Sequence, residues 1–145
     1  MAFRFRMQKI LDYREQLEEE AKVRLADAEQ RHEAARRHHE KVLALLTQAK
    51  EQALREPAKN AAEFWISEHY MKGLQKDLDN AAMQLQMTKE IRNEARRILA
   101  ERAMDKKMLA RLKERQKAAW NHDEMLKEQH FNDEIATIRY KASAF

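Results

Sequence analysis

The chain has 145 residues, of which 37% are charged and 7% aromatic, with a formal net charge of +4. It contains no cysteine, which excludes disulfides and thiolate metal sites, and no stretch approaches the ~20 apolar residues of a membrane-spanning helix. Ala, Glu, Lys, Arg, Leu, Gln and Met dominate, and they are strong helix formers. With helical periodicity, this mixture is typical of a coiled coil or long helices rather than a globular core. No secretory signal pattern is evident. The absence of cysteine fits the cytoplasm, where we expect the protein to be.

The first helix is predicted over about residues 4–55. From Leu25 onwards, small and apolar residues recur at alternating spacings of three and four, which indicates the seam of a left-handed coiled coil. Many seam positions are alanine, which buries little area, so we expect a long pairing of modest stability per turn. The seam residues of this helix are Leu25, Ala28, Ala35, Val42 and Leu46.

A turn is predicted at residues 56–60. Pro57 is the only proline of the chain, and a proline breaks or kinks a continuous helix. Asn60 and Glu63 then have the spacing of a capping box, in which each side chain satisfies a backbone amide of the new helix. One helix should therefore end near Arg55 and another should begin near Ala61.

The apolar cluster after the turn contains Phe64, Trp65 and Ile66, and Gly73 follows it closely. A glycine inside a helix costs about 1 kcal/mol relative to alanine. Gly73 is therefore either a kink or a second boundary. A separate short helix over 61–72 would absorb part of the difference in length between the two helices, and we favour it.

The long second helix is predicted over about residues 74–141. Its seam loses its apolar pattern at Arg102, Asp105 and Lys106, where polar residues occupy the stripe, and resumes afterwards. Its seam residues are Leu78, Leu85, Leu99, Leu109, Leu112 and Leu126. We therefore expect an all-α fold, a long two-stranded antiparallel coiled-coil hairpin forming a single elongated unit over residues 1–145.

No pattern indicates an enzyme, a cofactor site or a metal site. The sequence offers no glycine-rich loop to hold phosphate. One Glu-x-x-His unit, Glu29 to His32, resembles half of a di-iron motif, but such bundles need two of these units and two further glutamates. His32 and His39 fall on the seam, where imidazoles tolerate a partly wet interface; the alternative is a pH-sensitive register. We expect Trp65 and Trp120 to be packing residues.

A basic section spans residues 92–117, with ten basic and four acidic side chains and hence a local net charge of +6. Three interpretations remain open: a solvated helix face, a contact for a negatively charged protein, and a nucleic-acid contact. Interleaved acidic residues and the lack of an aromatic platform disfavour nucleic acid.

Two stretches resemble one protein family. The opening FRFRMQKILDYREQLEEE (residues 3–20) and the closing DKKMLARLKERQKAAWNHDEMLKEQHFNDEIATIRY (residues 105–140) resemble the start and the end of flagellar export proteins of the FliJ family. The resemblance extends over nearly the whole chain in length, charge and helical content.

This resemblance implies a non-enzymatic component of the bacterial flagellar type III export apparatus, at its cytoplasmic face, and hence a role in motility. FliJ proteins are antiparallel coiled coils similar to the central stalk of rotary ATPases. The implied partners are the hexameric export ATPase (FliI type), whose assembly and activity the protein promotes, the export gate protein (FlhA type) and export chaperones. Neither nucleic acid nor a small-molecule substrate is expected.

Both ends of an antiparallel hairpin's chain lie together, so we expect one binding surface there and another near the turn. By analogy with the stalk, the terminal surface should bind the ATPase ring through Phe3, Phe5, Met7, Ile10, Phe131, Ile135, Ile138 and Tyr140. The surface near the turn should bind the gate through Leu43, Leu46, Tyr70 and Leu74. The alternatives are a generic coiled-coil scaffold or adaptor and a stalk subunit of another rotary-type ATPase.

Overall fold

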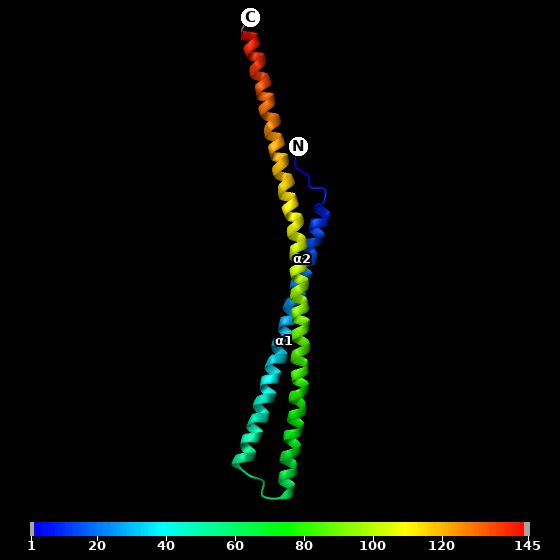
Figure 1. The fold of residues 1–145 in the computed structure, drawn as a ribbon, viewed down its shortest axis with the longest axis vertical. Helices are drawn as coiled ribbons and strands as arrows, with labels where there is room; N and C mark the ends of the chain where they lie inside the picture. The colour runs from blue at the N-terminus through cyan, green and yellow to red at the C-terminus, as the bar shows by residue number, and fades with distance from the viewer. Residues whose placement is uncertain (1, 144–145) are drawn as a thin grey trace. The chain divides into compact units, whose positions relative to one another are not determined.

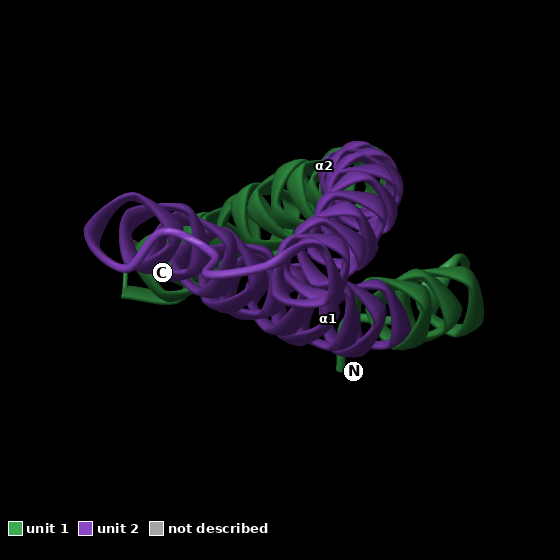
Figure 2. Cartoon of the chain, turned by 90° about the horizontal axis from the view of Figure 1, so that it is seen from below, with its two compact units in different colours: residues 1–18, 101–145 green, residues 19–100 purple. Residues whose placement is uncertain are grey.

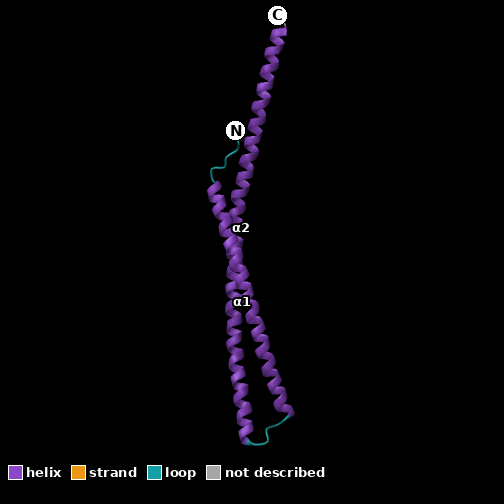
Figure 3. Cartoon of the chain, turned by 180° about the vertical axis from the view of Figure 1, so that it is seen from behind, coloured by secondary structure: helices purple, strands orange, loops and turns teal. Residues whose placement is uncertain are grey.

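The fold is a helical hairpin. The computed structural model describes residues 2–143, and these residues form two α-helices, α1 (Gln8–Arg55) and α2 (Ala61–Ser143), with no strand among them. The helices run in opposite directions and pack against each other (Figure 1 and Figure 3). The predicted fold class, an all-α antiparallel hairpin, is therefore confirmed.

The turn between the helices occupies residues 56–60. The Asn60 side-chain oxygen accepts a hydrogen bond from the backbone amide of Glu63 at 2.8 Å, which caps α2. The Glu63 carboxylate in return accepts from the amide of Lys59 at 2.9 Å, one residue before the position expected for a capping box. Both bonds satisfy amides that the helix itself cannot pair.

The start of α1 differs from the prediction. The helix begins at Gln8 and not near residue 4, and residues 2–5 lie outside it. The Gln8 amide donates to the Phe5 carbonyl at 3.1 Å, which closes a turn before the first helical residue. Phe5 is only 8% exposed and forms a small core with Leu11 and Leu109. Because the Phe5 side chain is buried in this core, the backbone of residues 2–5 does not continue the helix.

Gly73 does not divide the second helix. α2 runs without interruption from Ala61 to Ser143, so the expected separate helix over 61–72 is absent. Gly73 has no positive φ, and its neighbour Leu74 is buried at 8% exposure. Met71, two residues before the glycine, is half-buried. Packing on both sides of the glycine offsets its cost of about 1 kcal/mol and keeps the helix continuous.

The chain divides into two compact units, each with a segment from both helices (Figure 2). Unit 1 contains residues 1–18 and 101–145, and unit 2 contains residues 19–100. Met1, Ala144 and Phe145 of the expected 1–145 unit lie outside the described residues.

Unit 2 has a thin seam of small side chains. Its buried residues are Ala21, Ala28, Val42, Leu46, Leu74 and Ala81. The other predicted seam positions of this unit are half-buried: Leu25, Ala35, Leu78, Leu85 and Leu99. Alanines let the two helices approach closely, but they bury little apolar area per turn.

A polar pair lies within the seam of unit 2. His32 Nδ1 is 3.2 Å from Thr88 Oγ1. The Thr88 hydroxyl also lies 2.9 Å from the Gln84 carbonyl and 3.0 Å from the Leu85 carbonyl of its own helix. Because a side chain on α1 meets one specific side chain on α2, this bond favours one register of the two helices.

Unit 1 has a polar layer where the sequence pattern loses its apolar stripe. Glu18 is 7% exposed, and its carboxylate lies 3.0 Å from Lys106 Nζ. Arg14 donates to the Asp105 carbonyl at 2.8 Å. The chain thus fills these seam positions with an ion pair between the buried Glu18 and the half-buried Lys106 and with a charge-assisted hydrogen bond.

The apolar packing of unit 1 resumes at Leu109, which is 7% exposed, and at the half-buried Leu112. Leu126 does not belong to the seam as predicted, because it is 50% exposed. Phe3 contacts Trp120, which lies six residues before Leu126 on α2. The described N-terminal segment therefore covers α2 near Trp120, and Leu126 lies beyond that contact.

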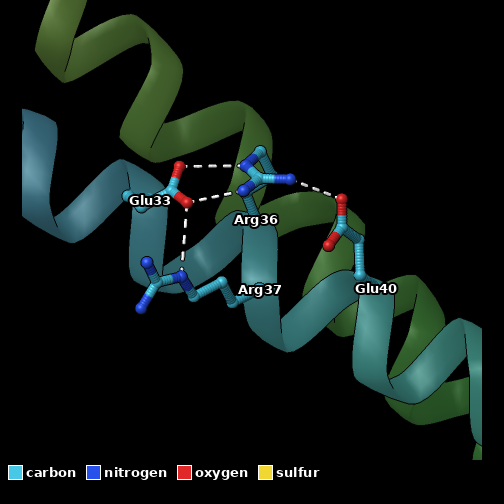
Figure 4. Close-up of polar contacts among 4 residues, drawn as sticks. All are labelled: Glu33, Arg36, Arg37 and Glu40. Carbon is cyan, nitrogen blue, oxygen red and sulfur yellow. Dashed lines mark hydrogen bonds and ion pairs between the residues drawn. The ribbon is translucent and has the colours of Figure 1, made fainter.

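The exposed side of α1 carries a compensated charge network (Figure 4). Arg36 donates to Glu33 at 2.5 and 2.9 Å and to Glu40 at 2.5 Å. Arg37 adds a bond of 3.3 Å to Glu33. The Arg36 hydrogen bond is the main cause that lowers the pKa of Glu33 from 4.5 to about 2. Pairs three and four residues apart stabilise a helix, so this face is supported without any partner.

The lowered pKa of Glu33 predicts a pH dependence of stability. The unfolded side chain keeps the ordinary pKa of 4.5, whereas the folded one has a pKa of about 2. The contribution of Glu33 is therefore fully present above pH 4.5 and is lost as the pH falls towards 2. We expect Glu33→Gln to lose less stability than the unmodified protein over that range, measured by urea unfolding followed by circular dichroism. Glu51→Gln, at an exposed position of the same helix, should keep the original pH profile; equal profiles for both variants would contradict the assignment.

Candidate functional site

The aromatic residues at the start of the chain are packed against α2. Phe5 is buried in the core of unit 1. The ring centroids of the half-buried Phe3 and of Trp120 are 6.2 Å apart, with an angle of 53° between the ring planes. The expectation that both rings form an exposed contact surface is therefore wrong for Phe5 and only partly met for Phe3. These rings attach the N-terminal segment to α2. Met7 and Ile10, at 41% and 48% exposure, remain accessible.

An exposed apolar stripe lies near the end of α2. Phe131 and Ile138 are 61% and 66% exposed, and Ile135 between them is half-buried. Spacings of four and three residues place these side chains on one helical face. Tyr140 is 76% exposed, but nine residues after Phe131 it falls on the opposite side of the helix. We name Phe131, Ile135 and Ile138 the terminal stripe.

The four residues predicted near the turn separate into two kinds. Leu46 and Leu74 are buried at 3% and 8% exposure, so they belong to the packing between the helices and not to an open surface. Leu43 and Tyr70 are 45% and 55% exposed. Each buried leucine is three or four residues from an exposed member of the set, which brings Leu43 and Tyr70 to the edges of the seam. We name Leu43 and Tyr70 the seam-edge pair.

A second apolar group near the turn is more exposed than the sequence suggested. Phe64, Trp65 and Ile66 are 60–65% exposed, and Leu54 is 83% exposed. Trp65 stacks on His69 with ring centroids 5.1 Å apart and planes 7° apart. It therefore packs along its own helix rather than into the seam. The signal was available in the sequence, because three consecutive helical residues point about 100° apart and cannot all face one seam.

A shallow hollow adjoins this group at the turn. It is lined from α1 and the turn by Ala53, Glu56 and Pro57 and from α2 by Phe64 and Met71, among others, with a volume of about 300 Å³. Glu63 and Glu68 also line it. The turn thus offers an apolar depression with acidic edges, which suits contact with a protein.

Both side chains of the Glu-x-x-His unit, Glu29 and His32, contact residues of α2. Glu29 lies 3.5 Å from Arg96, and His32 bonds with Thr88. Across residues 2–143, no group of three potential ligands is placed to hold a metal ion. Within the same residues, neither helix has a segment that combines the length and the apolar character of a membrane span.

Comparison with known proteins identifies the family of the chain. The family model of the flagellar FliJ protein matches residues 3–144, nearly the whole chain. No match was found among curated proteins or among solved structures. The match includes both stretches that suggested the family, and it confirms the resemblance. The chain therefore belongs to the FliJ family and is related to flagellar export.

Proposed function

We propose that the protein is a non-catalytic component of the flagellar export apparatus, which binds the hexameric export ATPase (FliI type) and promotes its assembly and activity. Membership of the FliJ family supports the proposal. So does the antiparallel pairing of two long helices, the arrangement found in the stalk of rotary ATPases. In this proposal the protein works at the cytoplasmic face of the apparatus, acts by contact, and also meets the export gate (FlhA type) and export chaperones.

The terminal stripe is the surface we assign to the ATPase ring. It carries the proposal because Phe131 and Ile138 are more than half exposed on one face of α2. Exposed apolar stripes on a helix are used to fill grooves in a partner. Phe3 and Phe5 then act indirectly, because they attach the N-terminal segment to an earlier part of α2.

The assignment predicts the effect of removing the stripe. We expect Phe131→Ala combined with Ile138→Ala to reduce stimulation of ATP hydrolysis by the cognate export ATPase by about tenfold or more, because truncation of anchor residues commonly costs at least 2 kcal/mol of binding energy. Hydrolysis is measured with and without the protein. Met83→Ala, at a 65% exposed position of unit 2, serves as the control and should stimulate normally.

Full stimulation by the double variant would show that the stripe is not the contact. Absence of stimulation even by the unmodified protein would instead favour a scaffold or the stalk of another rotary-type ATPase.

The seam-edge pair is the surface we assign to the export gate. Tyr70 is the stronger candidate, because tyrosine offers a large apolar ring with a polar tip and is enriched at protein contacts. Leu46 and Leu74 support this surface from within the seam, where they are buried. Changing Leu74 together with Tyr70 would therefore disturb packing as well as binding.

Changing only the exposed residues Leu43 and Tyr70 tests gate binding without disturbing the packing between the helices. We expect Leu43→Ala combined with Tyr70→Ala to weaken binding to the cytoplasmic part of the gate protein by about tenfold, measured by calorimetry, with little change in thermal unfolding because both side chains are about half exposed. Met87→Ala, at a similarly exposed position, is the matched control. Undiminished affinity of the double variant would rule out this surface.

A further inference from the structure

A row of three cations runs along the outside of α2 in unit 1. Lys107, Arg111 and Arg115 are exposed and lie at successive spacings of four residues. Leu109, two residues from Lys107 and from Arg111, is buried at 7% exposure. Two residues correspond to about 200° around a helix, so the cations point away from the packed side.

This row lacks the compensation found elsewhere on the helices. Like charges four residues apart disfavour a helix, and here two such pairs follow each other. Arg36, in contrast, lies between Glu33 and Glu40 and bonds with both, and Arg97 is paired with Glu94. Within residues 2–143, none of the three cations of the row has a carboxylate within 4.0 Å. Glu114, three residues after Arg111, does not pair with it either.

The surroundings of the row add positive charge. Residues 2–18 and 101–117, which pair in unit 1, hold eleven basic and six acidic side chains, a net charge of +5. The N-terminal segment contributes Arg4, Arg6 and Lys9, which are exposed. A local excess of this kind attracts an anionic partner and repels a basic one.

Two methionines lie beside the cations. Met104 and Met108 are 62% and 63% exposed. Met104 lies three residues before Lys107 and Met108 three residues before Arg111, so each occupies the same helical face as the cation that follows it. Methionine side chains are flexible and polarisable, and they adapt to apolar groups of different shapes. The surface therefore offers apolar contact and positive charge side by side.

This combination selects among anionic partners. Proteins that bind single-stranded nucleic acids stack bases on aromatic side chains, and the aromatic residue of 101–120, Trp120, is packed against Phe3. A membrane surface favours a wide apolar face with aromatic or leucine side chains, whereas this face has two methionines between charges. A helix with leucines on one side and glutamates beside them matches both the apolar and the charged positions of the row.

We propose that Met104, Lys107, Met108, Arg111 and Arg115 form a docking surface for an acidic amphipathic helix of a protein partner. The cations pair with glutamates or aspartates at spacings of four residues on the partner, and the methionines cover its apolar side chains. This surface shares no residue with the terminal stripe or the seam-edge pair. It is therefore a third surface, separate from those assigned to the ATPase ring and to the export gate.

The test uses the full chain and a labelled amphipathic peptide whose heptads carry two leucines flanked by glutamates. Binding is followed by fluorescence anisotropy at increasing salt. We expect Arg111→Glu to weaken binding by about tenfold or more, because it reverses one central charge of the interface. The variant places opposite charges four residues from Lys107 and from Arg115, and one like charge three residues from Glu114. The two favourable pairs outnumber the unfavourable one, so loss of the helix does not explain a loss of binding.

Two controls separate the charge pattern from net charge. Lys50→Glu makes the same change in net charge on an exposed part of α1 with no charged residue three or four positions away, and it should bind the peptide normally. A peptide with lysines in place of glutamates should not bind. Carbodiimide cross-linking should join a peptide glutamate to Lys107.

Three outcomes would overturn the proposal. The first is equal affinity of Arg111→Glu and the unmodified protein. The second is no binding of the acidic peptide at all. The third is binding of RNA or of phosphatidylglycerol vesicles through the same row while the peptide does not compete.

Discussion

The pairing of α1 with α2 inside one chain is the constraint on which the other features depend. Each helix has a narrow apolar stripe and a charged remainder, so neither can shield its stripe from water alone. In unit 2 the stripe is built largely from alanine, valine and leucine. A seam of small side chains gives little free energy per turn, and stability must accumulate along its length. The hydrogen bond between His32 and Thr88 therefore contributes more to the register of the two helices than to the free energy of their pairing.

Apolar side chains that lie between the two helices are buried, and those that lie outside the contact between them stay exposed. Phe3 and Phe5 engage α2 in unit 1. Phe131 and Ile138 lie beyond that contact and stay exposed. The same division separates Leu46 and Leu74 from Leu43 and Tyr70. The charged side chains differ in the same way, because Arg36 bonds with two glutamates of its own helix whereas Arg111 forms no ion pair within residues 2–143.

Much of the hairpin could be read from the sequence, because its signals are local. A proline such as Pro57 interrupts a helix at any interior position, and Asn60 caps the next helix through a bond within the same turn. Periodicity identifies which face of a helix is buried, but it does not show which residues of the other helix lie opposite that face. The burial of Phe5 and the exposure of Leu126 both depend on which residues lie opposite them. The predicted break at Gly73 was wrong for a similar reason. The sequence shows the helix-destabilising effect of the glycine, but it does not show that Leu74 packs against the other helix and keeps α2 continuous.

The central claim, that α1 and α2 of the same chain form this seam, can be tested with cysteines, because the natural chain has none. His32→Cys and Thr88→Cys replace two side chains whose polar atoms lie 3.2 Å apart. A short thiol-reactive bifunctional cross-linker should join the two cysteines of the double variant within one chain, seen as a faster-migrating monomer on a denaturing gel, and either single variant should not show it. Dimers linked between chains, with no internal cross-link, would contradict the hairpin and point to helices paired between copies.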